Sequence, residues 1–376
     1  MKRPAYDSPA VPIHWNRLQY VAGTREGVSV RPGTLEHIME MYKDNPEDLR
    51  DMLGDNPYEL RNIIDRWVLN DNPDLRFIPT DSIVITVDKE AVRRSGMMIA
   101  ADSIPDQMHI SLKGKRAVYK SEMMMYEMIA QCNWERPLYI AMTVGPDNRA
   151  TLENYFIQEG LTFRITPFNT KQSGRDIDTE KMYENLMTRF AFGGIDKPGI
   201  YLDETVLRMC STHRRIFSQL AARLVKEEKF DKAARVVAKV EEVIPPTTVP
   251  HSYASGSLEL ARVWNVLGKN KEACGIAYPV AVQATEYLDW YLSLPAKMLL
   301  LSERDFMYYL YQLHGALGVL ESAGSDKVME LSKELDKYNR LFQTRLYGDV
   351  GMDVPAEAED EPVEAEAEDE VEYEEE

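Results

Sequence analysis

The hydrophobic pattern of this chain changes near Tyr201, and that change limits the folds available to it. Before Tyr201, short runs rich in β-branched residues are typical of strands. After it, apolar residues recur every three or four positions over long stretches, which is typical of amphipathic helices. A chain of 376 residues is long enough for two or three domains. We therefore expect a mixed unit followed by an all-α unit.

Helical and strand-like segments alternate over the first 200 residues, which predicts a partial, mixed α/β layer. Strands are expected at residues 83–87, 108–112, 138–144 and 161–165. Helices are expected at residues 34–44, 57–69, 121–132 and 151–158. Ser121 is the expected N-cap of its helix, and Pro46 and Pro73 are expected to break the chain. The pattern leaves the order and direction of the strands open.

The segment 201–347 has the pattern of successive packed helices joined by short connections. Helices are expected at residues 204–228, 232–243, 257–267, 271–293, 303–322 and 326–346. Part of the segment resembles the tetratricopeptide pattern, in which small residues lie where two helices cross closely. One unit carries Ala221 and Ala233 at the matching spacing, and a second carries Ala261 and Ala273. Ala273 follows Ala233 by 40 positions, against about 34 in the ideal repeat.

The acidity of the chain is concentrated at its C-terminal end. The formal net charge is −18, and 14 Asp and Glu residues lie between Asp353 and Glu376, so removing those 14 charges leaves −4. Low complexity, like-charge repulsion and two prolines predict a disordered tail. The expected segments are a partial α/β domain at 1–200, a tetratricopeptide-like helical domain at 201–347 and a disordered acidic tail at 348–376.

Composition and motifs exclude several classes of protein. The nearly neutral body lacks the basic surface of a nucleic-acid binder. Cys132, Cys210 and Cys274 are too scattered for a disulfide framework and favour a reducing compartment. No apolar run reaches the ~18 residues of a membrane span, and the first residues do not have the pattern of a signal peptide. Because nucleotide-binding, nucleophile and metalloprotease motifs are missing, no catalytic, cofactor-binding or metal-binding residue is assigned.

One short stretch of the expected helix 204–228 carries candidate binding residues. Cys210 and His213 have the spacing of half a metal site, but two more ligands would be needed. A packed Cys210 and a His213 at the surface are the simpler interpretation. His213, Arg214 and Arg215 form a basic triplet that could contact an anion or a protein partner. A solvated helix face is the alternative.

Aromatic residues are dense between Tyr287 and Tyr311. They form either the core of a helix pair or a groove for a peptide or a glycan, because helical repeats carry their binding faces in such grooves. Trp290 and Tyr291 are the candidate partner-binding residues of this run.

Asp81, Asp88 and Asp102 lie near the ends of expected strands, where sites of α/β enzymes often form. Acidic residues are also common at such turns, so no catalytic role is assigned to them. They are the basis of one alternative, a soluble enzyme with a site in the α/β layer.

Several strings are more specific than the composition. They occupy residues 78–85, 133–141, 154–161, 192–195, 201–204 and 208–215. Together they resemble the C-terminal part of a family of large bacterial membrane proteins of unknown function. That family is similar to protein O-mannosyltransferase-like glycosyltransferases of GT-C type, which span the membrane many times and use lipid-linked sugar donors. The resemblance covers residues 1–347.

The resemblance implies a parent protein whose many-helix membrane region comes first and carries the sugar-transfer carboxylates. The present chain is then expected to be a non-catalytic soluble fragment on the extracytoplasmic side of the bacterial inner membrane. This location conflicts with the reducing compartment that the cysteines favour. The expected role is to present an acceptor protein or to dock protein partners. The first alternative is a free-standing helical-repeat interaction scaffold, and the second is the soluble enzyme.

Overall fold

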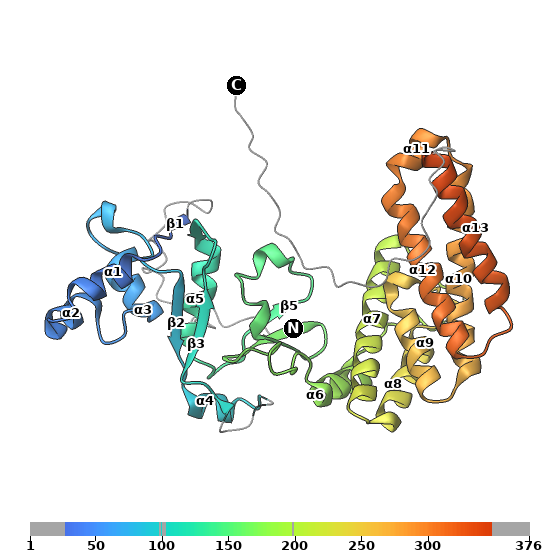
Figure 1. Ribbon diagram of the computed structural model, residues 1–376. Helices are drawn as coiled ribbons and strands as arrows, with labels where there is room; N and C mark the ends of the chain where they lie inside the picture. Colours follow the sequence, from blue (N-terminus) through green and yellow to red (C-terminus); the bar gives the residue numbers. More distant parts are fainter. Residues whose placement is uncertain (1–26, 98, 100–102, 198, 348–376) are drawn as a thin grey trace.

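The computed structural model describes residues 27–97, 99, 103–197 and 199–347 (Figure 1). Small sheets and short helices make up the part drawn from blue to green, and long helices make up the part drawn from yellow to red. This arrangement confirms a mixed N-terminal layer followed by a helical unit. The expected acidic tail and Asp102 lie outside the described residues.

In the described part of the N-terminal layer, there are three small antiparallel sheets. The first pairs β1 (Gly27–Ser29) with β4 (Ala117–Tyr119), the second pairs β2 (Ser82–Thr86) with β3 (Gln107–Ser111), and the third has the order β5 (Tyr139–Ala141), β7 (Thr162–Ile165), β6 (Phe156–Gln158). The four expected strands are present, with shifted ends. Strands of three to five residues leave each sheet with little surface of its own, so helices must cover it.

The sheet of β2 and β3 shows how side-chain alternation builds the N-terminal core. Ile83 lies opposite Ile110, and Ile85 lies opposite Met108. All four side chains are buried because residues two apart on a strand share a face. Helix α5 (Lys120–Cys132) packs against β2 and contributes to the same core.

Short helices surround these sheets. They are α1 (Thr34–Met41), α2 (Pro46–Leu53), α3 (Leu60–Ile63) with its π-helical extension Ile64–Val68, α4 (Lys89–Arg94) and α6 (Thr179–Glu184) with its π-helical extension Asn185–Arg189. Helix α1 ends at Met41, before Pro46, and Pro46 starts α2, where a proline at the first helical position needs no N–H partner.

Two details differ from expectation. The segment expected as a helix at 151–158 is instead a 3₁₀ turn, Glu153–Tyr155, followed by β6. All three β6 residues are buried, and the strand pairs with β7 on one side and bridges Ile177 on the other, so sheet contacts override the helical pattern.

Ser121 does not cap α5, since the helix begins at Lys120 and the Glu122 carboxylate accepts the Tyr119 N–H at 3.0 Å.

Seven helices fill the second part of the described chain. They are α7 (Glu204–Lys226), α8 (Phe230–Val243), α9 (Ser257–Val266), α10 (Asn270–Ser293), α11 (Ala296–Leu301), α12 (Glu303–Ser322) and α13 (Val328–Tyr347). Six were expected, and the short α11 was not. Helix α7 packs on α8 and α9, α10 packs on α9 and α12, and α13 packs on α12. The tetratricopeptide-like repeat and the domain limits stay predictions.

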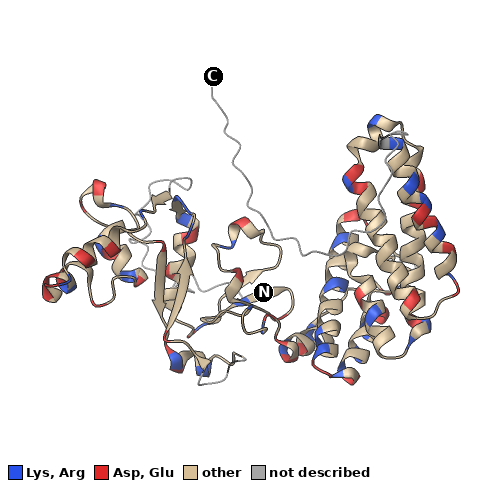
Figure 2. Ribbon diagram, in the orientation of Figure 1, with Lys and Arg blue, Asp and Glu red and all other residues tan. Residues whose placement is uncertain are grey.

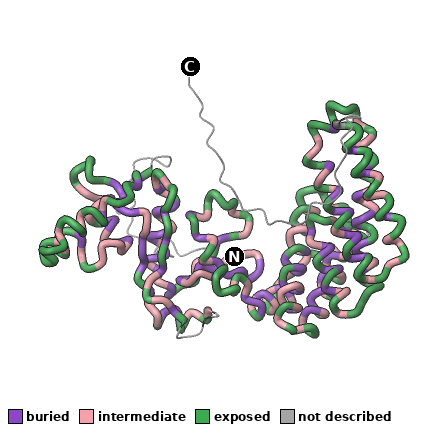
Figure 3. The backbone as a smooth tube through the Cα atoms, in the orientation of Figure 1, coloured by how far each residue is buried: buried purple, intermediate pink, exposed green. Residues whose placement is uncertain are grey.

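Buried residues follow the inward faces of these helices (Figure 3). Ala221, Ala233, Ala261 and Ala273 have no exposed surface, as expected where small side chains let helices approach closely. Lysine and arginine are interspersed with aspartate and glutamate over both parts (Figure 2). Among the described helices, none combines the length and the apolar character needed to cross a bilayer.

Candidate functional site

Six aromatic side chains form a continuous series of ring contacts, named here the aromatic strip. They come from α10, α12 and the 3₁₀ turn Tyr253–Ser255, and they are Tyr253, Tyr287, Trp290, Tyr291, Tyr308 and Tyr309. At one end, the ring centroids of Tyr253 and Tyr308 lie 5.5 Å apart. At the other end, those of Trp290 and Tyr291 lie 4.7 Å apart. In the middle, Tyr309 stacks on Tyr287 at 4.2 Å and joins α12 to α10.

Helix geometry explains why the strip is half buried and half exposed. Tyr287 and Tyr291 are four residues apart, so they lie on one side of α10. Tyr291 faces α12 and is 8% exposed, whereas Trp290 is 54% exposed. The strip therefore presents rings to solvent that are held from behind by buried rings.

A shallow hollow of about 420 Å³ runs along α10 beside the exposed rings. It is lined by Gln283, Glu286, Tyr287 and Trp290, so amide and carboxylate groups lie next to two aromatic faces. Such a surface can hold an apolar side chain and hydrogen-bond to its backbone.

The tyrosine hydroxyl at the centre of the strip stays protonated at neutral pH. Burial, followed by the neighbouring Tyr287 and Tyr291, raises the pKa of Tyr309 well above its usual range. Burial also raises the pKa of Tyr291 and Tyr308. These three hydroxyls are therefore uncharged at neutral pH.

The two predicted partner-binding residues, Trp290 and Tyr291, differ in their exposure to solvent. Trp290 and Tyr291 are brought into contact, but only Trp290 is accessible, because Tyr291 belongs to the core. Phe306, from the same aromatic run, stacks on Phe342 at 4.2 Å inside the helical unit. Tyr291 and Phe306 thus belong to the core, whereas a binding groove at the exposed residues of the run stays a prediction.

The residues of the basic triplet, His213, Arg214 and Arg215, also differ in their exposure to solvent. Arg214 has no exposed surface, and its guanidinium donates to the carbonyl oxygens of Ile244 at 2.8 Å, Val249 at 2.6 Å and Pro250 at 2.9 Å. Arg214 is thus not available to a partner at the surface, because it holds the connection between α8 and α9. Arg215 is exposed.

His213 packs against the segment that leads into α7. Its ring lies edge-on to Phe190 at 6.1 Å and to Phe192 at 6.4 Å, and its Nδ1 is 2.8 Å from the Met209 carbonyl oxygen. His213 and the buried Cys210 border a mainly apolar cavity of about 270 Å³. Within the described residues, no three His, Cys, Asp or Glu side chains gather as a metal site. The simpler interpretation of Cys210, as a packed thiol, fits its burial.

Of the two described strand-end aspartates, Asp88 uses its carboxylate in local structure, and Asp81 uses its backbone. Asp88 caps α4, where its Oδ1 accepts the Ala91 N–H at 3.0 Å. The Asp81 carbonyl oxygen accepts the Leu112 N–H at 2.7 Å beside β2 and β3.

Sequence reasoning missed a buried cluster of charges. Glu159 is buried, with 6% of the residue exposed. Its carboxylate accepts a hydrogen bond from Tyr139 Oη at 2.8 Å. The same carboxylate lies 3.1 Å from Lys181 Nζ and 3.5 Å from the Arg164 guanidinium. Arg164 also donates to the Ser95 carbonyl oxygen at 2.8 Å. The alternation of residues 162–165 gave no signal for this cluster, because it places Arg164 on the polar face of β7, opposite Phe163 and Ile165.

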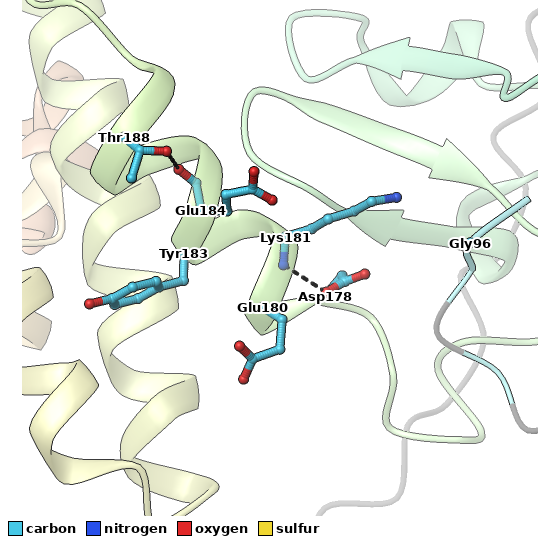
Figure 4. Close-up of a pocket in the computed structure, with 7 residues that line it drawn as sticks. All are labelled: Gly96, Asp178, Glu180, Lys181, Tyr183, Glu184 and Thr188. Atoms are coloured by element: carbon cyan, nitrogen blue, oxygen red, sulfur yellow. Dashed lines mark hydrogen bonds between the residues drawn. The ribbon is translucent and has the colours of Figure 1, made fainter.

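Lys181 also borders a hollow of about 510 Å³ beside α6 (Figure 4). Figure 4 shows its side chain extending toward the sheet, away from Tyr183 and Thr188. Asp178 caps α6 by accepting the Lys181 N–H at 2.9 Å. Of the carboxylates around this hollow, Glu180 pairs with two lysines and Glu184 pairs with Arg189, so the hollow is a polar junction.

Ion pairs connect this junction to the helical unit. Glu180 lies 2.9 Å from Lys229 and also pairs with Lys232 on α8. Arg223 on α7 lies 2.9 Å from Asp176. Hydrogen bonds to Lys232 and Lys229 lower the pKa of Glu180.

Comparison with known protein families matches part of the chain. Residues 1–183 match the family model described as TMEM260-associated domain 2, which covers 183 of the 376 residues. The match is consistent with a domain of a larger membrane-protein family and ends within α6. No curated protein and no solved structure matches the chain.

Proposed function

We propose that this chain is a non-catalytic part of a membrane glycosyltransferase-like protein, and that it presents an acceptor protein or docks protein partners. The aromatic strip is the observation that carries the docking role. The family match of residues 1–183 supports a membrane-protein parent. The glycosyltransferase-like parent and the tetratricopeptide-like repeats rest on the strings and helix pairs of the sequence.

Tyrosine and tryptophan suit protein recognition for a physical reason. They offer large contact area, lose few rotamers on binding and carry a polar atom at the rim, so they dominate the energy of many interfaces. Here, the exposed ring of Trp290 packs on the buried Tyr291, and the exposed rings of Tyr287 and Tyr308 pack on Tyr309. A supported ring needs no reorganisation before a partner binds.

A flexible segment of a partner protein is the best-matched ligand. The hollow along α10 is open and shallow, and Gln283 and Glu286 can pair with backbone or side-chain donors of an extended peptide. Acidic residues nearby, Glu286 and Asp305, disfavour an acidic segment. We therefore expect a neutral or basic peptide segment.

Site-specific photocross-linking tests this role. A benzophenone amino acid replacing Trp290 should cross-link a protein of the cell envelope in the native host. The same group at Met329, which is 72% exposed on α13, is the matched control and should not cross-link that protein. Equal cross-linking at both positions would contradict the proposal.

A second candidate, the soluble enzyme, has one observation in its favour. A cavity of about 230 Å³ lies at the end of β2 and is lined by Glu59, Arg61, Ile85, Thr86, Ala130 and Asn133. The Glu59 carboxylate accepts from Thr86 Oγ1 at 2.7 Å, and Arg61 donates to the Ala130 carbonyl oxygen at 2.6 Å. Turnover that is lost in Glu59→Gln with an unchanged melting temperature would favour this candidate.

A further inference from the structure

Negative charge borders the hollow along α10 from both of the helices that form the aromatic strip. Glu286 lines the hollow, and Asp305 lies one turn before Tyr309 on the side of α12 that faces α10. Burial, followed by the charge of Asp305, raises the pKa of Tyr291, so this carboxylate acts on the strip. Within the described residues, neither carboxylate has an ion-pair partner. Both charges are therefore available to a cation from outside the chain.

Basic side chains are scarce around the hollow. The sequence has three acidic residues and no lysine or arginine at positions 272–296. One of the three, Asp289, accepts from Tyr338 Oη at 2.9 Å and belongs to the contact between α10 and α13. On α12, Arg304 lies one turn before Tyr308, whose ring contacts Tyr253 at the other end of the strip. The surface around the hollow thus favours a positively charged ligand group.

Two aromatic rings lie beside the carboxylate of Glu286. The face of an aromatic ring is electron-rich and attracts a cation within about 6 Å of its centroid, tryptophan most strongly. Trp290 is 54% exposed and follows Glu286 by four residues, so the two side chains are neighbours on one side of α10. Tyr309 covers one face of Tyr287 and holds that ring in place. A cation in the hollow can therefore contact a ring and a carboxylate together.

A buried glutamine orients the polar end of the hollow. Gln312 on α12 is 1% exposed, and its Nε2 donates to the Val280 carbonyl oxygen at 2.8 Å and to Gln283 Oε1 at 3.4 Å. The amide oxygen of Gln283 is thus occupied, which leaves its Nε2 group as a donor at the hollow. A backbone carbonyl oxygen of a peptide is an acceptor that suits this donor.

We propose that the hollow binds an arginine side chain of a partner segment, an inference that rests on the docking role proposed above. The guanidinium stacks on Trp290 and pairs with Glu286, and a backbone carbonyl oxygen of the segment accepts from Gln283. Arginine is favoured over lysine because its planar group stacks on aromatic rings and forms two parallel hydrogen bonds with a carboxylate. The hollow thus makes the aromatic strip selective for basic segments.

Two small probes test the charge requirement without a partner protein. N-acetylarginine methylamide carries the guanidinium, and N-acetylcitrulline methylamide has nearly the same shape but is neutral. In titrations of the full chain followed by saturation-transfer NMR, the arginine probe should bind about fivefold more tightly or better. The corresponding lysine probe should fall between the two.

Single substitutions locate this preference. Glu286→Gln should reduce the preference for arginine over citrulline to within about twofold. Glu272→Gln is the matched control and should keep the preference, because Glu272 is exposed in the first turn of α10, about 20 Å from the hollow. Trp290→Ala should weaken binding of the arginine probe about fivefold.

Equal binding of the arginine and citrulline probes to the full chain would overturn the proposal, as would an unchanged preference in Glu286→Gln. Tighter binding of phosphocholine than of the arginine probe would overturn it in favour of a lipid headgroup.

Failure of this inference and failure of the docking role give different results. Cross-linking at Trp290 together with equal binding of the two probes would keep the docking role and reject its selectivity for arginine. A clear preference for the arginine probe, without a cross-linked protein, would support the cation site and contradict the docking role.

Discussion

Arg214 on α7 donates a hydrogen bond of 2.6 Å to the carbonyl oxygen of Val249, in the connection between α8 and α9. The same guanidinium donates to two further carbonyl oxygens of that connection. Burial lowers the pKa of Arg214, but an arginine remains charged at any physiological pH. A cation at this position therefore replaces the backbone partners that an irregular buried connection lacks.

Replacement of Arg214 by methionine should destabilise the protein strongly. Methionine keeps most of the volume but leaves three carbonyl oxygens without a donor, which we expect to cost about 3 kcal/mol or more. Urea unfolding measures the difference in free energy. Arg215→Met is the control, and its exposed position predicts a change within about 0.5 kcal/mol. Similar losses in the two variants would contradict the assignment of Arg214 to the core.

The adjacent aromatic residues Trp290 and Tyr291 should respond differently to truncation. Tyr291→Ala removes a ring that is 8% exposed and packs on Tyr309 and Phe306, so the free energy of unfolding should fall by about 3 kcal/mol. Trp290→Ala removes a ring that is 54% exposed and should cost about 1 kcal/mol. Partner cross-linking or pull-down should show the reverse order, after correction for folding. A larger stability loss in Trp290→Ala would assign that ring to the core.

These two pairs show what the sequence could predict. Long periodicity over residues 204–347 predicted six of the seven helices, because many turns repeat the same apolar pattern. Periodicity did not distinguish Arg214 from Arg215, or Trp290 from Tyr291, since adjacent residues on a helix differ by about 100° in direction. Which of the two faces inward depends on the helices that pack there.

The N-terminal layer was less predictable for a different reason. Four of its seven described strands were predicted from short apolar, β-branched runs, whereas β1, β4 and β6 were not. Strand β1 pairs with β4 across 90 residues of sequence. Pairing at such separation leaves no local pattern. The helix expected at 151–158 failed because Phe156 and Ile157 are buried on both faces of a sheet, and a short apolar run of this kind fits either structure. The contacts of Glu159 could not be predicted from the sequence either, because they join side chains of β5, β7 and α6.

Two glycines should respond oppositely to alanine. Gly318 lies within α12 with open space around its added Cβ, so Gly318→Ala should raise the free energy of unfolding by about 0.5–1 kcal/mol. Gly256 has φ +73°, and a Cβ there would lie 3.2 Å from the Arg215 Cα and closer still to the Ser218 hydroxyl. Gly256→Ala should therefore lower the melting temperature by several degrees. Thermal unfolding followed by circular dichroism measures both, and a tolerated Gly256→Ala would contradict the close approach of α7.

Alkaline pH should destabilise the protein through Tyr126. Its hydroxyl donates to the Ala150 carbonyl oxygen at 2.9 Å, and burial raises the pKa of Tyr126 to about 12. An unfolded tyrosine has a pKa of about 10, so between pH ~10 and ~12 the unfolded state holds fewer protons than the folded state. The contribution of this group is complete below pH ~10 and is lost as pH rises toward 12, by about 2–3 kcal/mol.

The Tyr126→Phe variant checks this pH dependence. It loses the hydrogen bond and should be less stable at neutral pH by about 1 kcal/mol. The difference in free energy of unfolding between wild type and variant should fall from pH ~10 and change sign before pH ~12, because only the wild type has this phenol to ionise. Burial also raises the pKa of Tyr139 to about 12, so both proteins keep a common alkaline slope that cancels in the difference. A difference that is constant over this range would mean that Tyr126 ionises equally in the folded and unfolded states, and so has access to water.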